Sequence, residues 1–200
     1  MFRLIDSLIF SNPLELKGRG MSSLYFGPGY YEKFTAPREK WMGSIRQNDK
    51  IKWQYDDGGR SGFTDRKDKG ACVTRAIVIA SGLPYSQVHE IVTSVCEEFN
   101  VRNSKKIVAG RRYKSGVNRG VDRKLTKKLM KYFGFKWVPL MGIGTGCKVH
   151  VRTSELPTTG RLILNLSHHV AAYIDGVLRD TYDCSRNGKR CVYGYWHKPS

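Results

Sequence analysis

The dipeptide Asp175-Gly176 lies between two runs of strand-forming residues, HVAAYI and VLRDTYD, and it constrains the fold more than any other stretch of the chain. Asp-Gly is among the strongest signals for a two-residue hairpin turn. Such a turn fixes the strand register, so that Ile174 faces Val177 and later pairs follow in step. Because side chains alternate between faces, His169 and Asp180 become diagonal neighbours on one face, with Cα atoms about 7–8 Å apart.

Helical periodicity dominates the chain before this hairpin. Apolar residues share one face from Cys72 to Ala80, and Ser81-Gly82 ends the segment, although the β-branched run VTRAIVIA also fits a buried strand. A clearer helix follows Leu83-Pro84 and carries apolar residues at helical spacing from 88 to 99. A third helix is predicted over 121–133, with Gly134 as its C-terminal stop.

Strand-like runs dominate the chain after Phe135. They are FKWVPLM, RLILNLS, HVAAYI, VLRDTYD and CVYGYW, separated by Gly, Pro, Asn and Asp. An earlier short strand is predicted in KIKWQYDDGGR. Helices followed by strands predict an α+β fold with N-terminal helices packed on a C-terminal antiparallel sheet. Residues 1–50 lack a clear period and are interpreted as an extended N-terminal arm, which leaves 51–200 as the folded domain.

Positive charge is concentrated in one segment. The chain has 35 Lys and Arg against 17 Asp and Glu, a formal charge of +18. Residues 100–136 hold 13 of those basic residues and one acid, Asp122. Basic residues cover the outer face of the third predicted helix: Arg123, Lys124, Lys127, Lys128 and Lys131. This face predicts a surface for a polyanion such as nucleic acid, against the alternative of a solvated basic face that keeps the protein soluble.

Five scattered cysteines make an odd count. No signal peptide is recognised in MFRLIDSLIF, and no apolar run reaches the roughly 20 residues that a membrane span needs. We therefore expect free thiols in a reducing, cytoplasmic setting rather than a disulfide framework, and no membrane partner.

Cys72, in the segment KGACVTRAI, stands at the start of a predicted helix. A neighbouring imidazolium and a helix N-terminus both lower the pKa of a thiol. The predicted hairpin can supply the imidazole of His169, and the carboxylate of Asp180 can orient it. The alternative is that Cys72 is a small buried hydrophobe, as free cysteines often are.

A resemblance to a known family supports the first interpretation. A cysteine opening a helix, then a histidine starting a strand and an Asp on the next strand resembles the papain-like cysteine peptidase fold. GACVTRAIVIASGLPYSQV, GIGTGCKVH, SELPTTGRLILNLSHHVAAYIDGVLRDTYD and RCVYGYW resemble small proteins of bacteriophages and bacteria. The likeness covers about residues 52–196. It implies Cys72 as nucleophile, His169 as general base and acid, and Asp180 as orienting group.

One residue departs from that pattern. Papain-like enzymes usually place a Gln six residues before the cysteine, as a donor to the oxyanion, and here that position is Arg66. The backbone N–H of Cys72 supplies one donor, and Gln54 is the candidate for the second. Loss of one such donor lowers a rate by about 10²–10³.

Other residues compete for these roles. His168 and Asp183 pair under the same register on the opposite sheet face, and form the alternative histidine and carboxylate. Cys147 and His150, together with Cys184 and Cys191, offer four zinc ligands, although their spacing matches no familiar zinc module. Cys147, in a Gly-rich loop, is also an alternative cleft residue or nucleophile.

The sequence thus predicts a cysteine-dependent acyl-transfer enzyme, a peptidase, isopeptidase or amidase, that needs no cofactor or metal. Transglutaminase-like transfer stays open, since an amine acceptor would use the same three residues. The expected partner is a protein or peptide substrate, acidic ones included, with nucleic acid as a second candidate through residues 100–136. The resemblance implies a phage protein acting in the host cytoplasm or packaged in the virion. The alternatives are a non-enzymatic nucleic-acid-binding protein on a degenerate papain-like scaffold, or a structural virion component.

Overall fold

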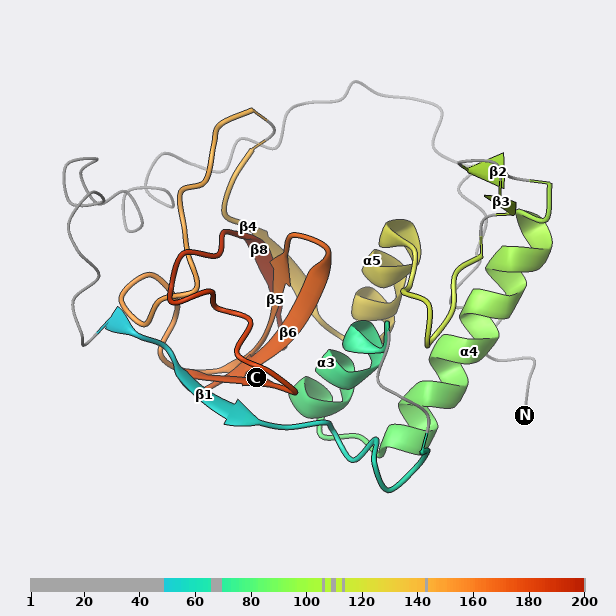
Figure 1. The fold of residues 1–200 in the computed structure, drawn as a ribbon, viewed down its shortest axis with the longest axis horizontal. Helices are drawn as coiled ribbons and strands as arrows, with labels where there is room; N and C mark the ends of the chain where they lie inside the picture. The colour runs from blue at the N-terminus through green and yellow to red at the C-terminus, as the bar shows by residue number, and fades with distance from the viewer. Residues whose placement is uncertain are drawn as a thin grey trace. The chain divides into compact units, whose positions relative to one another are not determined.

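A computed structural model describes residues 49–65, 70–105, 107–108, 111–112, 114–142 and 144–199. The chain divides into two compact units, 1–44 and 45–200, and all described residues lie in the second. The predicted N-terminal arm over 1–50 therefore lies almost wholly outside the described residues, as does Arg66. The elements, labelled in Figure 1, are β1 (Lys52–Tyr55), α3 (Cys72–Ser81), α4 (Tyr85–Arg102), β2 (Ile107–Val108), β3 (Arg111–Arg112), α5 (Arg123–Tyr132), β4 (Lys136–Pro139), β5 (Arg161–Leu166), β6 (His169–Ile174), β7 (Val177–Asp180) and β8 (Val192–His197).

Six strands form one mixed sheet in the order β1-β7-β6-β5-β8-β4. The turn between β6 and β7 has positive φ at both Asp175 (46°) and Gly176 (82°), as the favoured two-residue hairpin turn requires. Ile174 pairs with Val177, which confirms the predicted register. The tight turn thus places the start of β6 beside the end of β7.

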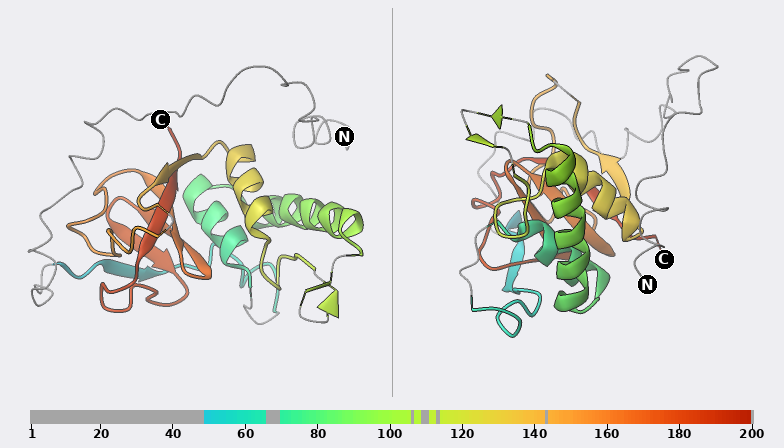
Figure 2. Two further views of the ribbon diagram at one scale, coloured as in Figure 1. Left: turned by 90° about the horizontal axis from the view of Figure 1, so that it is seen from above. Right: turned by 90° about the vertical axis from the view of Figure 1, so that its right-hand side faces the viewer.

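The helices cover one face of this sheet. Figures 1 and 2 show α3 directly against the sheet, with α4 and α5 beyond it. Arg161 of β5 fixes the C-terminal end of α3 by donating to the backbone carbonyls of Ile79 and Ala80 at 2.8 and 2.6 Å. Helix α3 therefore runs across the central strands with its first residue, Cys72, near the start of β6.

The opposite face packs against the long connections between strands. Sheet residues such as Leu164, Tyr173 and Leu178 join one buried core with Val151 and Cys184 from those connections. The segment after β7 belongs to this second layer, and it brings the buried Cys184 against the sheet.

The α+β class and the helix-before-strand order are confirmed, and α3 is a helix rather than a buried strand. The prediction of an antiparallel sheet is wrong at one edge, because β1 pairs with β7 in parallel. The two strands run parallel because α3 and α4 intervene between them and provide the long crossover that parallel pairing needs. None of the helices in the described part of the chain is long and apolar enough to cross a bilayer.

The expectation of five free thiols is also wrong. Cys147 and Cys191 form a disulfide across 44 residues, while Cys72, Cys96 and Cys184 are free. The isolated bridge between His150 and Cys191 brings the Gly-rich loop beside the start of β8, a contact that the scattered positions do not reveal. The cytoplasmic location loses the support of that argument and stays a prediction.

Candidate active site

Cys72 is the first residue of α3, and its side chain is partly exposed. Among the described residues no side chain caps the helix, and the first helical hydrogen bond runs from the N–H of Arg75 to the carbonyl of Ala71. The preceding N–H groups therefore have no acceptor within the helix, and their partial positive charge favours a thiolate at this end.

His169 supplies the imidazole. It begins β6 directly after the two-residue turn of Ser167 and His168, and its side chain lies close enough to Cys72 to lower the pKa of the thiol. Its Nε2 atom lies 2.5 Å from Oδ2 of Asp180, which ends β7. The predicted diagonal pair is thus a direct hydrogen bond.

Arg75 extends this chain of contacts. Its Nη2 atom donates to the other carboxylate oxygen, Oδ1 of Asp180, at 2.7 Å, and the Thr181 N–H donates to the same oxygen at 2.8 Å. The side chains of Arg75 and Asp180 are only 5% and 2% exposed, so water screens this ion pair little. One helix therefore carries both the thiol and the cation that fixes the carboxylate, one turn apart.

Two further side chains surround the imidazole. The sulfur of Cys184, a residue that is 1% exposed, lies within 4.8 Å of a ring nitrogen of His169, and the Tyr182 ring lies 5.4 Å from the imidazole between centroids. Both residues follow β7 in the connection to β8. They restrict the ring on the sides that Cys72 and Asp180 leave open.

The charges of these groups support one another. Burial opposes ionisation of Cys72, but the His169 hydrogen bond and charge, the Val170 backbone N–H and the Arg75 charge outweigh it and lower the pKa of the thiol. Burial likewise opposes a charged His169, yet hydrogen bonds with Asp180, Cys184 and Cys72 raise its pKa to about 12.

The carboxylate behaves in the same way. Burial would raise the pKa of Asp180, but the His169 hydrogen bond and the Arg75 charge lower it instead. All three shifts favour the charged forms, a Cys72 thiolate beside a His169 imidazolium, backed by the Asp180 carboxylate and the Arg75 guanidinium. A lowered thiol pKa is the property that a cysteine nucleophile needs.

A cleft of about 830 Å³ opens beside Cys72 and His169. Its described lining comes from the start of α3, from α5 and the loop before it, from β4 and the Gly-rich loop, and from the β5–β6 turn and β8. Trp137 and Trp196 lie on one side, with ring centroids 4.6 Å apart. The nucleophile is thus open to a ligand of several residues rather than sealed in the core.

The oxyanion donors are partly assigned. The backbone N–H of Cys72 stands in the first turn of α3, where the helix supplies no acceptor, and its role as a donor stays a prediction. Gln54 is exposed on the edge strand β1, in register with Arg179, and is not among the residues that line the cleft. The structure therefore does not bring the predicted second donor to Cys72.

The alternative pair is not assembled. His168 occupies the left-handed position of the β5–β6 turn, with φ 53°, and is exposed. Asp183 instead accepts a hydrogen bond from the Ser185 N–H at 2.9 Å. His168 lines the cleft, but no carboxylate of the described residues is paired with it.

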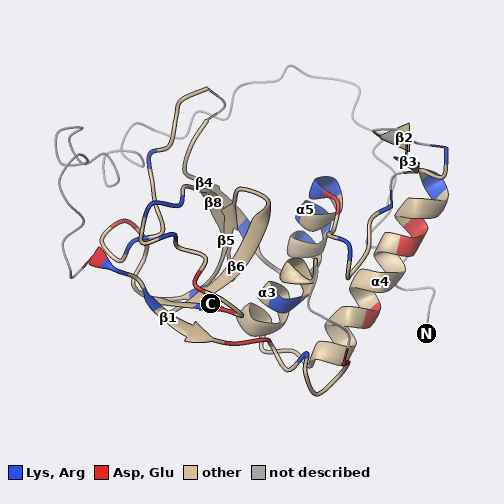
Figure 3. Cartoon of the chain, viewed as in Figure 1, with Lys and Arg blue, Asp and Glu red and all other residues tan. Residues whose placement is uncertain are grey.

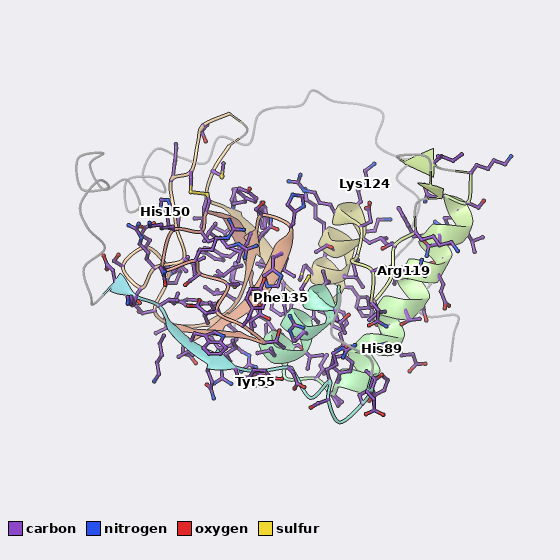
Figure 4. The ribbon with its side chains drawn as sticks, viewed as in Figure 1. Tyr55, His89, Arg119, Lys124, Phe135 and His150 are labelled. Atoms are coloured by element: carbon purple, nitrogen blue, oxygen red, sulfur yellow. A yellow bond between two sulfur atoms is a disulfide. The ribbon has the colours of Figure 1, made fainter. Side chains whose placement is uncertain are left out.

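The four-ligand zinc alternative is overturned. Cys147 and Cys191 are bonded to each other, and His150 Nε2 lies 3.5 Å from the Cys147 sulfur, beside the disulfide drawn in yellow in Figure 4. Cys184 lies beside His169 and Asp180, and is not grouped with Cys147, His150 and Cys191 as the zinc alternative required. The bond also removes Cys147 as an alternative nucleophile.

The described residues do contain one group with metal-ligand chemistry. Atoms of His169, Asp180 and Cys184 lie within 4.8 Å of one another. Arg75 and the Thr181 N–H already engage the carboxylate, so this group serves the imidazole in the structure.

All five predicted basic residues of α5 are exposed, and Figure 3 shows Lys and Arg on its successive turns. Only Arg123 and Lys127 line the cleft, whereas Lys124, Lys128 and Lys131 do not. The basic face is thus divided between the cleft wall and the surface beyond it.

The sequence reasoning missed Arg75 and Cys184. Arg75 is the one charged residue of the otherwise apolar helix α3. Because charges are rarely buried unless paired, this position predicts an acidic partner in the core. Cys184 gave no such signal, since its contact with His169 depends on how the connection after β7 folds back.

The site is that of a cysteine, histidine and aspartate grouped around a cleft. No family model matches the chain, and no curated protein or solved structure is significantly similar to it.

Proposed function

We propose that the protein is a cysteine-dependent acyl-transfer enzyme of papain-like type, and that Cys72, His169 and Asp180 form its catalytic triad. The observation that carries the proposal is the hydrogen bond between His169 and Asp180 beside Cys72, with Cys72 and His169 both lining an open cleft. A buried structural cysteine would need neither the lowered pKa nor the cleft.

The reaction follows from the positions of the groups. The Cys72 thiolate attacks a carbonyl carbon, and the negative charge moves to the carbonyl oxygen, where the N–H at the start of α3 stabilises it. The His169 imidazolium gives its proton to the leaving amine, the C–N bond breaks and a thioester forms. His169 then takes a proton from water, whose oxygen attacks the thioester; the C–S bond breaks, the acid is released, and the Cys72 thiolate and His169 imidazolium are restored.

Hydrolysis makes the protein a peptidase, isopeptidase or amidase, and an amine in place of water makes it a transferase. A phage origin, with action in the host cytoplasm or virion, belongs to the same proposal through the resemblance. No step calls on a cofactor or metal.

The test is the pH dependence of iodoacetamide alkylation, with the modified cysteine located by mass spectrometry. Wild-type Cys72 should react far below the ordinary thiol pKa of about 8.5. His169→Ala should shift its reaction to higher pH, and Cys72→Ser should abolish it. Cys96 and Cys184, 2% and 1% exposed, are internal references that should stay unmodified in the folded protein.

Contrary outcomes are equally clear. If Cys72 reacts no faster than an ordinary thiol, the enzymatic proposal fails. If His168→Ala rather than His169→Ala shifts the profile, the catalytic histidine is the neighbouring residue. Where Cys72 is activated, trapping of an acyl group on it from a p-nitrophenyl ester would establish the thioester step.

One observation favours a second candidate, a nucleic-acid-binding role. Lys124, Lys128 and Lys131 are exposed on α5 outside the cleft, where they can approach a phosphate backbone (Lys124 is labelled in Figure 4). Binding of a single-stranded oligonucleotide should then weaken steeply with salt. Replacing the three lysines by Gln should reduce the salt dependence and leave Cys72 alkylation unchanged.

A further inference from the structure

The cleft beside Cys72 has two chemically different walls. Helix α5 contributes Arg123, Thr126 and Lys127, while Trp137 of β4 and Met141 lie among the apolar lining residues. Cys72 and His169 line the same cleft. A bound chain in this cleft would therefore contact cations and aromatic rings while its carbonyl meets the thiol.

The charge of the cleft has one sign. Of the described residues that line it, none is Asp or Glu, whereas Arg123 and Lys127 are permanent cations and His168 adds a basic group. Within the described part of the chain, neither Arg123 nor Lys127 forms an ion pair, in contrast to Arg75 and Arg152. Their charges are thus available to a ligand.

The aromatic part of the lining is fixed in place. Gly194 packs so closely on Trp137 that a Cβ there would lie 2.4 Å from two ring atoms. The Trp137 ring also packs on Trp196 and keeps 40% of its surface exposed. A preformed apolar surface of this kind suits a peptide side chain or an extended backbone.

We propose that Arg123 and Lys127 form an anion subsite in the cleft, which selects acyl donors that carry carboxylates, and thus acidic peptides. The inference rests on the proposed function, because it assigns the substrate class of the same Cys72 site. Nucleic acid is the less suitable occupant of the cleft, since it carries no acyl carbon for the thiolate to attack.

Two independent features support an acidic peptide. Arg123 and Lys127 line the same cleft as Cys72, whereas the other lysines of α5 do not. The cleft volume of about 830 Å³ also lies within the range of about 300–1,000 Å³ typical of ligand pockets, enough for a few residues of a peptide.

The experiment compares bromoacetyl tripeptide amides that differ only by Glu or Gln at the first, second or third residue. Each reagent forms a thioether with the Cys72 sulfur and releases bromide, so no turnover is needed. At one position or more, Glu should react about three- to tenfold faster than Gln at low salt, as expected for one or two partly exposed ion pairs. The preference should shrink as the salt concentration rises.

Variants assign the effect to the subsite. Arg123→Gln/Lys127→Gln should abolish the preference, whereas Lys52→Gln/Lys189→Gln, which removes two exposed charges outside the cleft lining, should retain it. If Lys52→Gln/Lys189→Gln loses the preference for Glu to the same extent as Arg123→Gln/Lys127→Gln, the preference reflects the overall charge of the protein, and the subsite is overturned. Equal rates for Glu and Gln at every position would overturn it as well.

The neutral reagent iodoacetamide separates the two proposals. Slow alkylation of Cys72 in every variant would mean that the proposed function fails, and the inference with it. Rapid alkylation in wild type and in Arg123→Gln/Lys127→Gln, without a preference for Glu, would overturn only the subsite. If a single-stranded oligonucleotide blocks alkylation more strongly than a poly-glutamate peptide, nucleic acid is the better occupant and the acidic-peptide assignment fails.

Discussion

Replacing Arg75 by Met should destabilise the protein strongly, because it leaves the Asp180 carboxylate buried without its guanidinium. The two side chains are 5% and 2% exposed, and their atoms lie 2.7 Å apart. Removing one partner of a buried ion pair costs about 3–5 kcal/mol, since the remaining charge keeps its desolvation penalty. Here His169 retains one hydrogen bond to Asp180, which places the expected loss near the lower end, about 3 kcal/mol.

The assay is urea unfolding at neutral pH, followed by tryptophan fluorescence, on a double-mutant cycle. Asp180→Asn alone should also be destabilising, because the buried Arg75 guanidinium then loses the carboxylate that it pairs with. The double variant Arg75→Met/Asp180→Asn should lose less than the sum of the single variants, by about 2 kcal/mol or more. Arg75→Met should also raise the pKa of Cys72, as the Arg75 charge helps to lower it.

Arg102 provides a matched control. It pairs with Glu98 at 2.9 Å, a similar separation, but the two side chains are 55% and 34% exposed. Arg102→Gln should therefore cost about 0.5 kcal/mol or less. The reasoning is refuted if Arg75→Met costs less than about 1 kcal/mol, or if the two single variants add within about 0.5 kcal/mol.

Three further predictions concern pH, backbone packing and the disulfide. The lowered pKa of Asp180 contributes stability above its unfolded pKa of about 3.9 that is lost as pH falls through the folded value. In urea unfolding, the deficit of Asp180→Asn should thus shrink between about pH 5 and 2. Gly70→Ala should cost about 1–3 kcal/mol and slow Cys72 alkylation, because φ is +74° and a Cβ would lie 2.6 Å from a backbone nitrogen in the loop before α5. Reducing the Cys147–Cys191 bond should lower the free energy of unfolding by about 4 kcal/mol, from the loop closed across 44 residues.

Each of these has a contrary outcome. A pH-independent deficit for Asp180→Asn would mean that its carboxylate titrates normally in the fold. Gly59→Ala is the control, because Gly59 has a similar φ of +80° but no atom within 4 Å of a Cβ. If Ala costs the same stability at Gly59 and at Gly70, the cost comes from backbone strain and not from the close contact at Gly70. The Cys147→Ser/Cys191→Ser variant, which lacks the disulfide, is the reference. If reductant leaves the free energy of unfolding of the wild type unchanged, the disulfide is excluded.

The sequence by itself determined the hairpin and the three helices. Asp175-Gly176 favours positive φ at both positions, which is a local preference, and the alternation of side chains then carries His169 to Asp180 across only 11 residues. Helical periodicity similarly gave α3, α4 and α5 within a few residues, since the pattern repeats over each segment. The cysteine at the head of α3 and the imidazole on the hairpin were therefore predictable as candidates.

Only the tertiary structure decided what lies around them. The Arg75–Asp180 ion pair spans 105 residues, and neither local backbone preference nor side-chain alternation reaches that far. The parallel edge strand β1, the Cys147–Cys191 disulfide and the contact of Cys184 with His169 depend in the same way on how separate segments pack. Gln54 shows the converse, because a plausible residue type at a plausible distance in sequence lies exposed on the edge strand β1 and outside the cleft lining. Local rules position neighbours along the chain, while burial and packing of the whole domain decide which distant side chains meet.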